Sequence, residues 1–244
     1  MTARNARRRL VPARGIIRPM NVIVTGGSGA LGSAVVDAFL DAGHTVMAVG
    51  RQKGGGEHPS GRLHWTNYDL TTAEAATQLI EEALRKLGVY DAVIHTMGGF
   101  AGGQTLPAVS DDVWTQMMAV NLYSAFYLFR AALPRLLEQR RGRLLAIGTR
   151  TAVQAAPGLA AYTVSKAGLH ALVATLALEL KGTGVTTNIV VPSVIDTAAN
   201  RAAMPKEDFG KWVQPKSIAS LLLWLASEQA ADVNGAAIPI YGGA

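Results

Sequence analysis

Short apolar runs alternate with longer amphipathic runs along the chain from Met20 onward. The short runs are rich in β-branched residues, which favours strands, and the longer runs repeat their apolar positions at the helical period. The predicted strands are residues 21–25, 45–49, 63–65, 92–96, 144–148, 186–191 and 236–240. The predicted helices are residues 30–40, 72–87, 111–139, 159–180 and 215–227.

This alternation of strands and helices predicts an α/β fold, in which helices cover both faces of a parallel sheet. Because crossovers between parallel strands are right-handed, we expect a doubly wound sheet, a Rossmann fold of about seven strands. Such sheets bind ligands at the carboxyl edge of their strands. Residues 20–244 contain no internal repeat, linker or change of composition, which indicates a single domain.

The excess positive charge of the chain lies in an N-terminal leader, residues 1–19. The chain has 23 basic and 17 acidic residues, and six of the basic residues are arginines of this leader, which contains no acid. The rest of the chain is therefore electrically balanced. A disordered leader is the favoured interpretation, and a nucleic-acid-binding arm or an amphipathic targeting peptide are the alternatives.

Composition excludes several classes of protein. Hydrophobic residues make up 49% of the chain, which suffices for a large core, yet no apolar run approaches the ~18 residues of a membrane span. The chain has no cysteine, and its five histidines show no metal-ligand spacing. We therefore expect no metal, no membrane, no nucleic-acid partner and a cytoplasmic location.

A glycine-rich turn, residues 25–32, joins the first strand to the first helix. Glycines let the backbone approach a pyrophosphate closely, and a helix N-terminus offers free N–H groups. The spacing differs from the common G-x-G-x-x-G pattern, so a mere tight turn is the alternative. Its position between a strand and a helix favours a dinucleotide site. The predicted cofactor-binding residues here are Gly26, Ser28, Gly29, Ala30, Leu31 and Gly32.

Residues after the second and third strands bear on the choice of cofactor. An acid after the second strand would bind a ribose 2′-hydroxyl, but the segment 50–53 contains none and includes Arg51. Since arginine binds phosphate bidentately, the sequence predicts NADP(H) in preference to NAD(H), unless Arg51 is an ordinary solvated residue. Asp69 and Leu70 are expected to border the adenine pocket, with capping of the next helix as the alternative for Asp69.

Tyr162 and Lys166 stand four residues apart at the start of the helix 159–180, so their side chains share one face. A phenol with a pKa of about 10 is a poor acid or base at neutral pH. A neighbouring ammonium lowers that pKa and makes the phenol usable in catalysis. A solvated helix face is the alternative for this pair.

Taken together, these segments resemble the short-chain dehydrogenase/reductase family over residues 20–244. The family pattern is Thr-Gly-x-x-x-Gly-x-Gly, an Asn on the long helix, a Ser, and Tyr-x-x-x-Lys. The matching residues are Thr25, Gly26, Gly32, Asn121, Tyr162 and Lys166. Ala30 replaces the middle glycine, and Thr149 replaces the serine thirteen residues before the tyrosine. These departures leave open a catalytically weak, nucleotide-sensing binding protein of the same fold.

The resemblance implies hydride transfer between a nicotinamide and a small-molecule carbonyl or imine. Tyr162 would be the acid or base, Lys166 would lower its pKa and bind the nicotinamide ribose, and Thr149 would orient the substrate. Asn121 would hold a water molecule that links Lys166 to solvent. Further cofactor contacts would come from Gly98, Pro192, Ile195 and Thr197. Family members pair through surplus apolar helix faces, so we expect a homodimer or homotetramer.

One segment points to a branch of the family. Residues 98–103 resemble the glycine-rich loop of dihydropteridine reductases, and so do several residues between 196 and 212. On this resemblance Gly99, Phe100 and Trp212 would line the substrate pocket. Those reductases generally favour NADH and carry an acid after the second strand, which this chain lacks.

Overall fold

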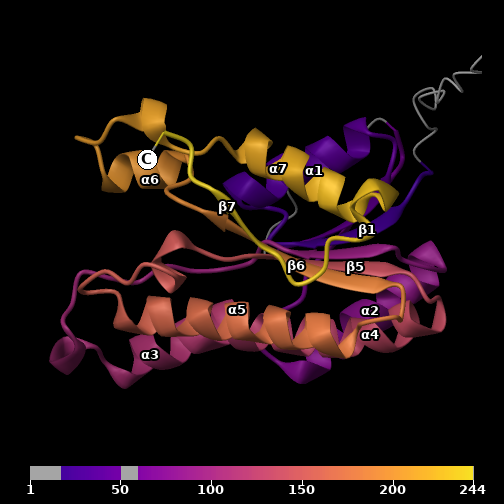
Figure 1. Cartoon of the computed structure of the whole chain (residues 1–244), viewed down its shortest axis with the longest axis horizontal. Helices are drawn as coiled ribbons and strands as arrows, with labels where there is room; N and C mark the ends of the chain where they lie inside the picture. Colours follow the sequence, from indigo (N-terminus) through magenta and orange to yellow (C-terminus); the bar gives the residue numbers. More distant parts are fainter. Residues whose placement is uncertain (1–17, 51–59, 244) are drawn as a thin grey trace, which may run out of the picture.

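A single seven-stranded sheet forms the centre of the computed structural model, which describes residues 18–50 and 60–243 (Figure 1). Every strand pairing is parallel, and the strand order is β3-β2-β1-β4-β5-β6-β7. The strands are β1 (Asn21–Thr25), β2 (Thr45–Val49), β3 (Leu63–Thr66), β4 (Ala92–His95), β5 (Gly142–Ile147), β6 (Val185–Pro192) and β7 (Ala237–Ile240). The predicted α/β fold with a doubly wound parallel sheet is confirmed.

Helices cover both faces of this sheet, as Figure 1 shows. The helices α1 (Ala30–Asp41) and α7 (Pro215–Ala226) pack together on one face. The opposite face carries α2 (Ala73–Leu87), α4 (Ser124–Glu138) and α5 (Ala160–Glu179), with α3 (Asp111–Met118) beside α5. The short helices are η1 (Leu106–Ala108), η3 (Arg150–Ala152), α6 (Ala198–Ala203), η4 (Phe209–Lys211) and η5 (Glu228–Ala230).

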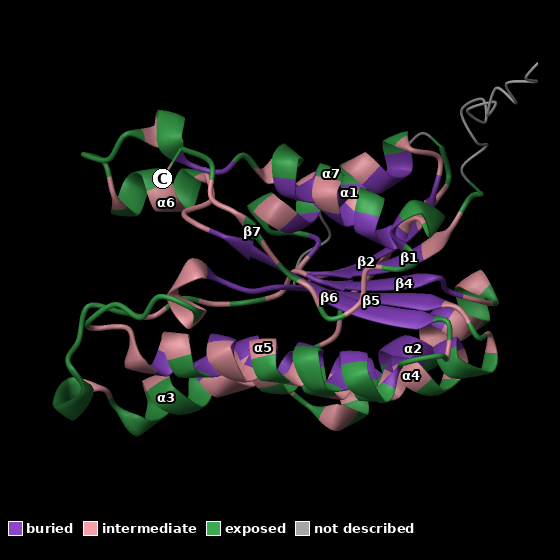
Figure 2. Cartoon of the chain, in the orientation of Figure 1, coloured by how far each residue is buried: buried purple, intermediate pink, exposed green. Residues whose placement is uncertain are grey.

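Two apolar cores lie on either side of the sheet, because successive strand residues point to opposite faces. In β1, Val22 and Val24 pack under α1 and α7, whereas Ile23 belongs to the core beneath α2, α4 and α5. Figure 2 shows buried residues along the central strands and on the inner faces of the helices. This two-sided burial explains why the strands appear in the sequence as nearly continuous apolar runs.

The predicted helix 111–139 is interrupted in the structure. After α3, the five residues Ala119–Tyr123 form a π-helical segment, η2, and α4 then continues to Glu138. A π turn accommodates an extra residue and is often found at functional sites. Asn121 lies in this segment and is completely buried. The prediction of one regular helix was wrong here, because a single inserted residue shifts the apolar period by only one position, too little to separate two helices in the sequence.

Helix α5 is long and apolar enough to cross a membrane by length and composition alone. In the structure its inner face packs on the sheet, with Ala161, Leu169 and Val173 buried in or beside the core. Core helices meet the same criterion of length and composition, and α5 occupies the position of a core helix.

The carboxyl ends of the strands bring the predicted site segments to one edge of the sheet. The glycine turn follows β1, the glycine-rich loop follows β4, and Thr149 follows β5. Arg51, on which the NADP(H) prediction depends, lies outside the described residues. The same is true of the leader up to residue 17.

Candidate active site

The glycine turn after β1 is a close-packed backbone cradle. Gly26 has φ 70°, and a Cβ there would lie 2.8 Å from the backbone nitrogen of Met97. At Gly32, in the first turn of α1, a Cβ would lie 2.0 Å from the carbonyl oxygen of Gly26. Only glycine therefore permits this approach of turn and helix. Ala30 begins α1 with helical geometry, so its methyl group is accommodated.

Within the part of the chain that the structure describes, no side chain caps the N-terminus of α1. The first N–H groups of a helix have no partner within the helix, and together with the helix dipole they favour an anionic ligand. Leu31 and Gly32 belong to this first turn. The start of α1 thus offers backbone donors where the sequence predicts a pyrophosphate.

A cavity of about 680 Å³ lies along this edge of the sheet. Its volume is within the range of small-molecule sites, roughly 300–1,000 Å³. It is lined by the glycine turn, by residues that follow β2 and β3, and by the loop after β4. The predicted site residues among its lining are Gly26, Ser28, Gly29, Asp69, Leu70, Gly98, Gly99 and Phe100.

Asp69 forms a local turn at the border of this cavity. Its Oδ1 accepts hydrogen bonds from the backbone nitrogen of Thr71 at 3.1 Å and from the Thr71 hydroxyl at 2.7 Å. Thr72, and not Asp69, caps α2 by accepting from the backbone nitrogen of Ala75. Asp69 therefore shapes the cavity wall instead of capping the next helix.

Tyr162, near the start of α5, meets Thr149, which follows β5. Thr149 is buried, and its hydroxyl lies 3.3 Å from the Thr151 hydroxyl. Burial raises the pKa of Tyr162 above its ordinary value, and the nearby Thr149 side chain offsets part of this rise. The ring of Phe100 packs edge-on against the Tyr162 ring, with centroids 5.0 Å apart. Tyr162 thus neighbours both the Thr149 side chain and an aromatic side chain of the cavity wall.

Lys166 is buried one helical turn after Tyr162. Its Nζ donates to the carbonyl oxygen of Ile147 at 2.9 Å, and burial lowers its pKa to about 8. A Cβ on Gly98 would lie 3.2 Å from this Nζ, so the ammonium approaches the wall of the 680 Å³ cavity. The predicted lowering of the Tyr162 pKa by Lys166 stays a prediction, because the structure shows the ammonium bonded to a backbone carbonyl.

Asn121 fastens the loop after β4 to α5. Its Oδ1 accepts from the backbone nitrogen of Gly99 at 3.0 Å, and its Nδ2 donates to the Gly99 carbonyl oxygen at 3.1 Å. The same Nδ2 donates to the Ser165 hydroxyl at 3.1 Å, which in turn donates to the carbonyl oxygen of Tyr162 at 2.8 Å. Sequence reasoning missed Ser165; its inward position three residues after Tyr162 is the signal that could have found it.

His95, at the end of β4, joins three elements. Its Nδ1 lies 2.9 Å from the Thr25 hydroxyl of β1, and its Nε2 lies 3.1 Å from the Ser124 hydroxyl of α4. Burial, and secondarily the charge of Lys166, lowers the pKa of His95 to about 3. The imidazole is therefore neutral at physiological pH and acts as a buried connector below the site.

The predicted site residues after β6 lie apart from the cavity lining. Pro192 ends β6, Ile195 packs against the core under α1 and α7, and the Thr197 hydroxyl caps α6. Trp212 is buried and packs on Phe209, with ring centroids 4.7 Å apart. Among the described residues, these four do not line the 680 Å³ cavity. Their contacts with nicotinamide or substrate stay predictions.

The parallel sheet, the glycine turn at its first β–α junction and the buried tyrosine–lysine helix define a class of protein, the α/β oxidoreductases with a nucleotide-binding fold. Residues 20–208 match the family described as short chain dehydrogenase. The chain belongs to the short-chain dehydrogenase/reductase family.

Relatives of known name agree with this assignment. The chain is 28% identical over 233 residues to the 3-oxoacyl-(acyl-carrier-protein) reductase of Salmonella typhimurium, covering 91% of this chain and 95% of that protein. It is 29% identical over 241 residues to the 2,3-dihydro-2,3-dihydroxybenzoate dehydrogenase of Escherichia coli, covering 91% and 96%. The fold matches that of Thermoplasma acidophilum aldohexose dehydrogenase with a TM-score of 0.84 at 23% identity, covering 93% and 94% of the two chains.

Proposed function

We propose that the protein is an NADP(H)-preferring oxidoreductase, with NAD(H) as a weaker cofactor. It transfers a hydride between the nicotinamide and a carbonyl, alcohol or pterin-like imine of a small molecule. The observation that carries this proposal is the meeting of Tyr162, Thr149 and Phe100 beside a cavity walled by the glycine turn. Two relatives named as a 3-oxoacyl reductase and a dihydrodihydroxybenzoate dehydrogenase support carbonyl–alcohol chemistry.

The residues at the cavity fit a dinucleotide. Gly26 and Gly32 leave the space that a Cβ would fill, and the uncapped start of α1 offers donors to a pyrophosphate. The segment 50–53 directly after β2 contains no acid and includes Arg51, a composition that favours a cofactor with a 2′-phosphate. A bound nicotinamide would supply or accept the hydride.

The side chains at the site transfer the proton, orient the substrate and bind the nicotinamide ribose. Tyr162 gives a proton to the substrate oxygen in reduction and takes it back in oxidation. Thr149 orients that oxygen through its hydroxyl, and Lys166 stabilises the phenolate and binds the nicotinamide ribose. Asn121 fixes the loop that carries Phe100. It would also hold a water molecule that links Lys166 to solvent.

Consumption of NADPH and NADH tests this proposal directly. The substrates to compare are quinonoid dihydropterin, quinones, ketones and acyl thioesters. The Tyr162→Phe variant should lose turnover and keep its affinity for NADPH, since only the acidic hydroxyl is removed. Tyr123→Phe, on the exposed side of the η2 segment, is the matched control and should leave turnover unchanged. Undiminished turnover in Tyr162→Phe would refute the assigned role.

A nucleotide-sensing binding protein is the second candidate function. It is favoured by the raised pKa of Tyr162 and by the bond from Lys166 to the Ile147 carbonyl, which directs the ammonium to the backbone. Such a protein would bind NADPH but reduce none of the substrates, with or without Tyr162. Reduction of any one of them at a rate that depends on Tyr162 decides for the enzyme.

The outer faces of α4 and α5 support a homodimer or homotetramer. Large apolar side chains are exposed there, including Phe126, Leu137, Val164 and Leu178. Several exposed large apolar side chains on the outer helices are typical of a surface that packs against another subunit. Sedimentation of the wild type against Val164→Glu should show a smaller assembly for the variant.

We propose that this assembly is cytoplasmic and acts on small molecules, without nucleic-acid or membrane partners.

A further inference from the structure

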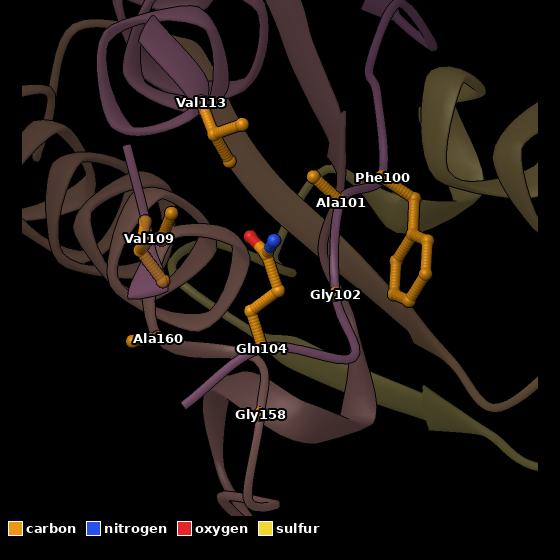
Figure 3. Close-up of a pocket in the computed structure, with 9 residues that line it drawn as sticks. Phe100, Ala101, Gly102, Gln104, Val109, Val113, Gly158 and Ala160 are labelled. Carbon is orange, nitrogen blue, oxygen red and sulfur yellow. The ribbon is translucent and has the colours of Figure 1, made fainter. Parts of the chain in front are cut away.

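A second cavity, of about 440 Å³, adjoins the active site between α3, α5 and the loop after β4 (Figure 3). Phe100, Gln104, Val109, Val113 and Ala160 are among the side chains that line it. The cavity is large enough for a small ligand or a substantial part of one. None of the roles assigned above uses it.

The walls of this second cavity are held by the fold. The backbone nitrogen of Gly103 donates to the Gly158 carbonyl oxygen at 2.9 Å, which ties the loop after β4 to the approach to α5. The Ser110 hydroxyl accepts from the backbone nitrogen of Val113 at 3.3 Å and caps α3. These bonds hold the loop after β4 against the approach to α5 and fix the first turn of α3, the backbone on two sides of the cavity.

The lining of the second cavity selects for neutral ligands. Apolar side chains and glycines make up the lining except for Gln104, and none of the nine lining residues is charged. Figure 3 shows the Gln104 amide directed into the space between Val109, Val113 and Ala101. An ionised group placed against these nine described lining residues would meet no charge of opposite sign, whereas an apolar chain would cover the ring of Phe100, which is 68% exposed. An apolar chain with at most one hydrogen-bonding group fits this lining.

Phe100 connects the second cavity to the site of reaction. It lines both cavities, and its ring packs against Tyr162. Ala161, which also lines the second cavity, directly precedes Tyr162. We infer that the second cavity binds a neutral alkyl substituent of the substrate while the carbonyl lies at Tyr162, and that the Gln104 amide hydrogen-bonds to a polar atom of that substituent. This inference rests on the proposed function.

A homologous series of 2-alkanones, from 2-butanone to 2-decanone, tests the inference with NADPH as reductant. Each methylene that enters the cavity should raise kcat/KM about threefold to fourfold until the space is filled. The Val113→Phe variant fills the cavity, so its kcat/KM should be nearly independent of chain length. Val153→Phe, at a position 57% exposed and outside both cavities, is the control and should keep the dependence.

Binding of hexanamide, a neutral compound without a ketone or aldehyde group, provides a test that does not need turnover. NMR titration of the protein with NADPH present should give a Kd about tenfold higher for Val113→Phe than for wild type. Val109→Phe serves the same purpose should Val113→Phe fail to fold. Gln104→Leu should weaken hexanamide about threefold to tenfold, because one hydrogen bond is lost.

The two tests separate the inference from the proposed function. Equal affinity of hexanamide for wild type and both filled variants would overturn the inference, as would a chain-length dependence that survives Val113→Phe. If hexanamide binds as expected but no carbonyl compound is reduced, the proposed function fails while the assignment of the second cavity as an alkyl-binding site stands.

Discussion

Replacing Asn121 by alanine should destabilise the protein and loosen the catalytic loop at the same time. Asn121 is completely buried, and its amide makes three hydrogen bonds to nitrogen and oxygen atoms, two to the backbone of Gly99 and one to the Ser165 hydroxyl, besides a weak one to the Met117 sulfur at 3.7 Å. Alanine removes all three and leaves the Gly99 and Ser165 groups without these partners. Because Phe100 directly follows Gly99, its packing on Tyr162 depends on the same bonds.

The size of this effect follows from the number of bonds. Each hydrogen bond contributes about 1 kcal/mol net, so three together contribute about 3 kcal/mol to the free energy of unfolding. For a chain of this length, 1 kcal/mol shifts Tm by roughly 2–4 °C, so Tm should fall by about 6–12 °C. The catalytic loss should be about tenfold or more in kcat/KM, because the wall beside the phenol is no longer fixed.

Urea unfolding and calorimetry measure the first quantity, and NADPH-dependent ketone reduction measures the second. Asn200→Ala is the matched control, since the Asn200 side chain makes one bond, to the Ile195 carbonyl oxygen, and its loss should cost about 1 kcal/mol. A destabilisation of Asn121→Ala no larger than that of Asn200→Ala would refute the reasoning that Asn121 holds the loop.

Three further predictions concern the charge, the cofactor and the glycine turn. Burial lowers the pKa of Lys166 from 10.5 to about 8. Between these two pH values the folded state binds fewer protons than the unfolded state, so the free energy of unfolding rises with pH. Between about pH 7 and about pH 9.5 the free energy of unfolding of the wild type, measured with urea, should rise by about 2 kcal/mol relative to that of Lys166→Met. Parallel pH profiles for the two proteins would contradict the lowered pKa. Arg51→Ala should raise the Kd of NADPH about tenfold to a hundredfold and that of NADH less than about threefold in fluorescence titrations, and equal weakening would exclude a 2′-phosphate contact. Gly32→Ala should lower the free energy of unfolding by about 2 kcal/mol more than Gly29→Ala. The new Cβ would lie 2.0 Å from the Gly26 carbonyl oxygen at position 32 but 3.3 Å from it at position 29. Equal Tm values for the two variants would show that the turn can relax.

The order and type of the main elements could be predicted from the sequence, because their signals are local. The strand of Asn21–Thr25 is predicted with its observed ends, since a β-branched apolar run stops at a glycine turn. The glycine turn itself could be predicted for the same reason, because its signal is local. The short α6 has no such apolar period, and its cap by Thr197 becomes apparent only in the structure.

The contacts within the site join residues that lie far apart in the sequence. Asn121 bonds to Gly99, 22 residues away, and to Ser165, 44 residues away. The bond from Lys166 to the Ile147 carbonyl spans 19 residues. No spacing rule connects such positions, because the fold and the π turn together determine which side chains meet. The sequence therefore predicts which residues belong to the site more readily than what each of them touches.

The glycine-rich loop after β4 resembles that of dihydropteridine reductases, but its glycines also have structural reasons within this chain. A Cβ at Gly98 would lie 3.1 Å from the Asn121 Oδ1, and one at Gly99 would lie 3.2 Å from a Val120 methyl. Gly102 would meet the Leu159 side chain at 2.3 Å, and Gly103 has φ 92°. Every glycine of this loop is thus explained by the packing or the backbone of this chain. The glycines alone therefore do not argue for a pterin substrate, and specificity is to be sought in the side chains of Phe100, which packs on Tyr162, and Gln104, which lines the second cavity.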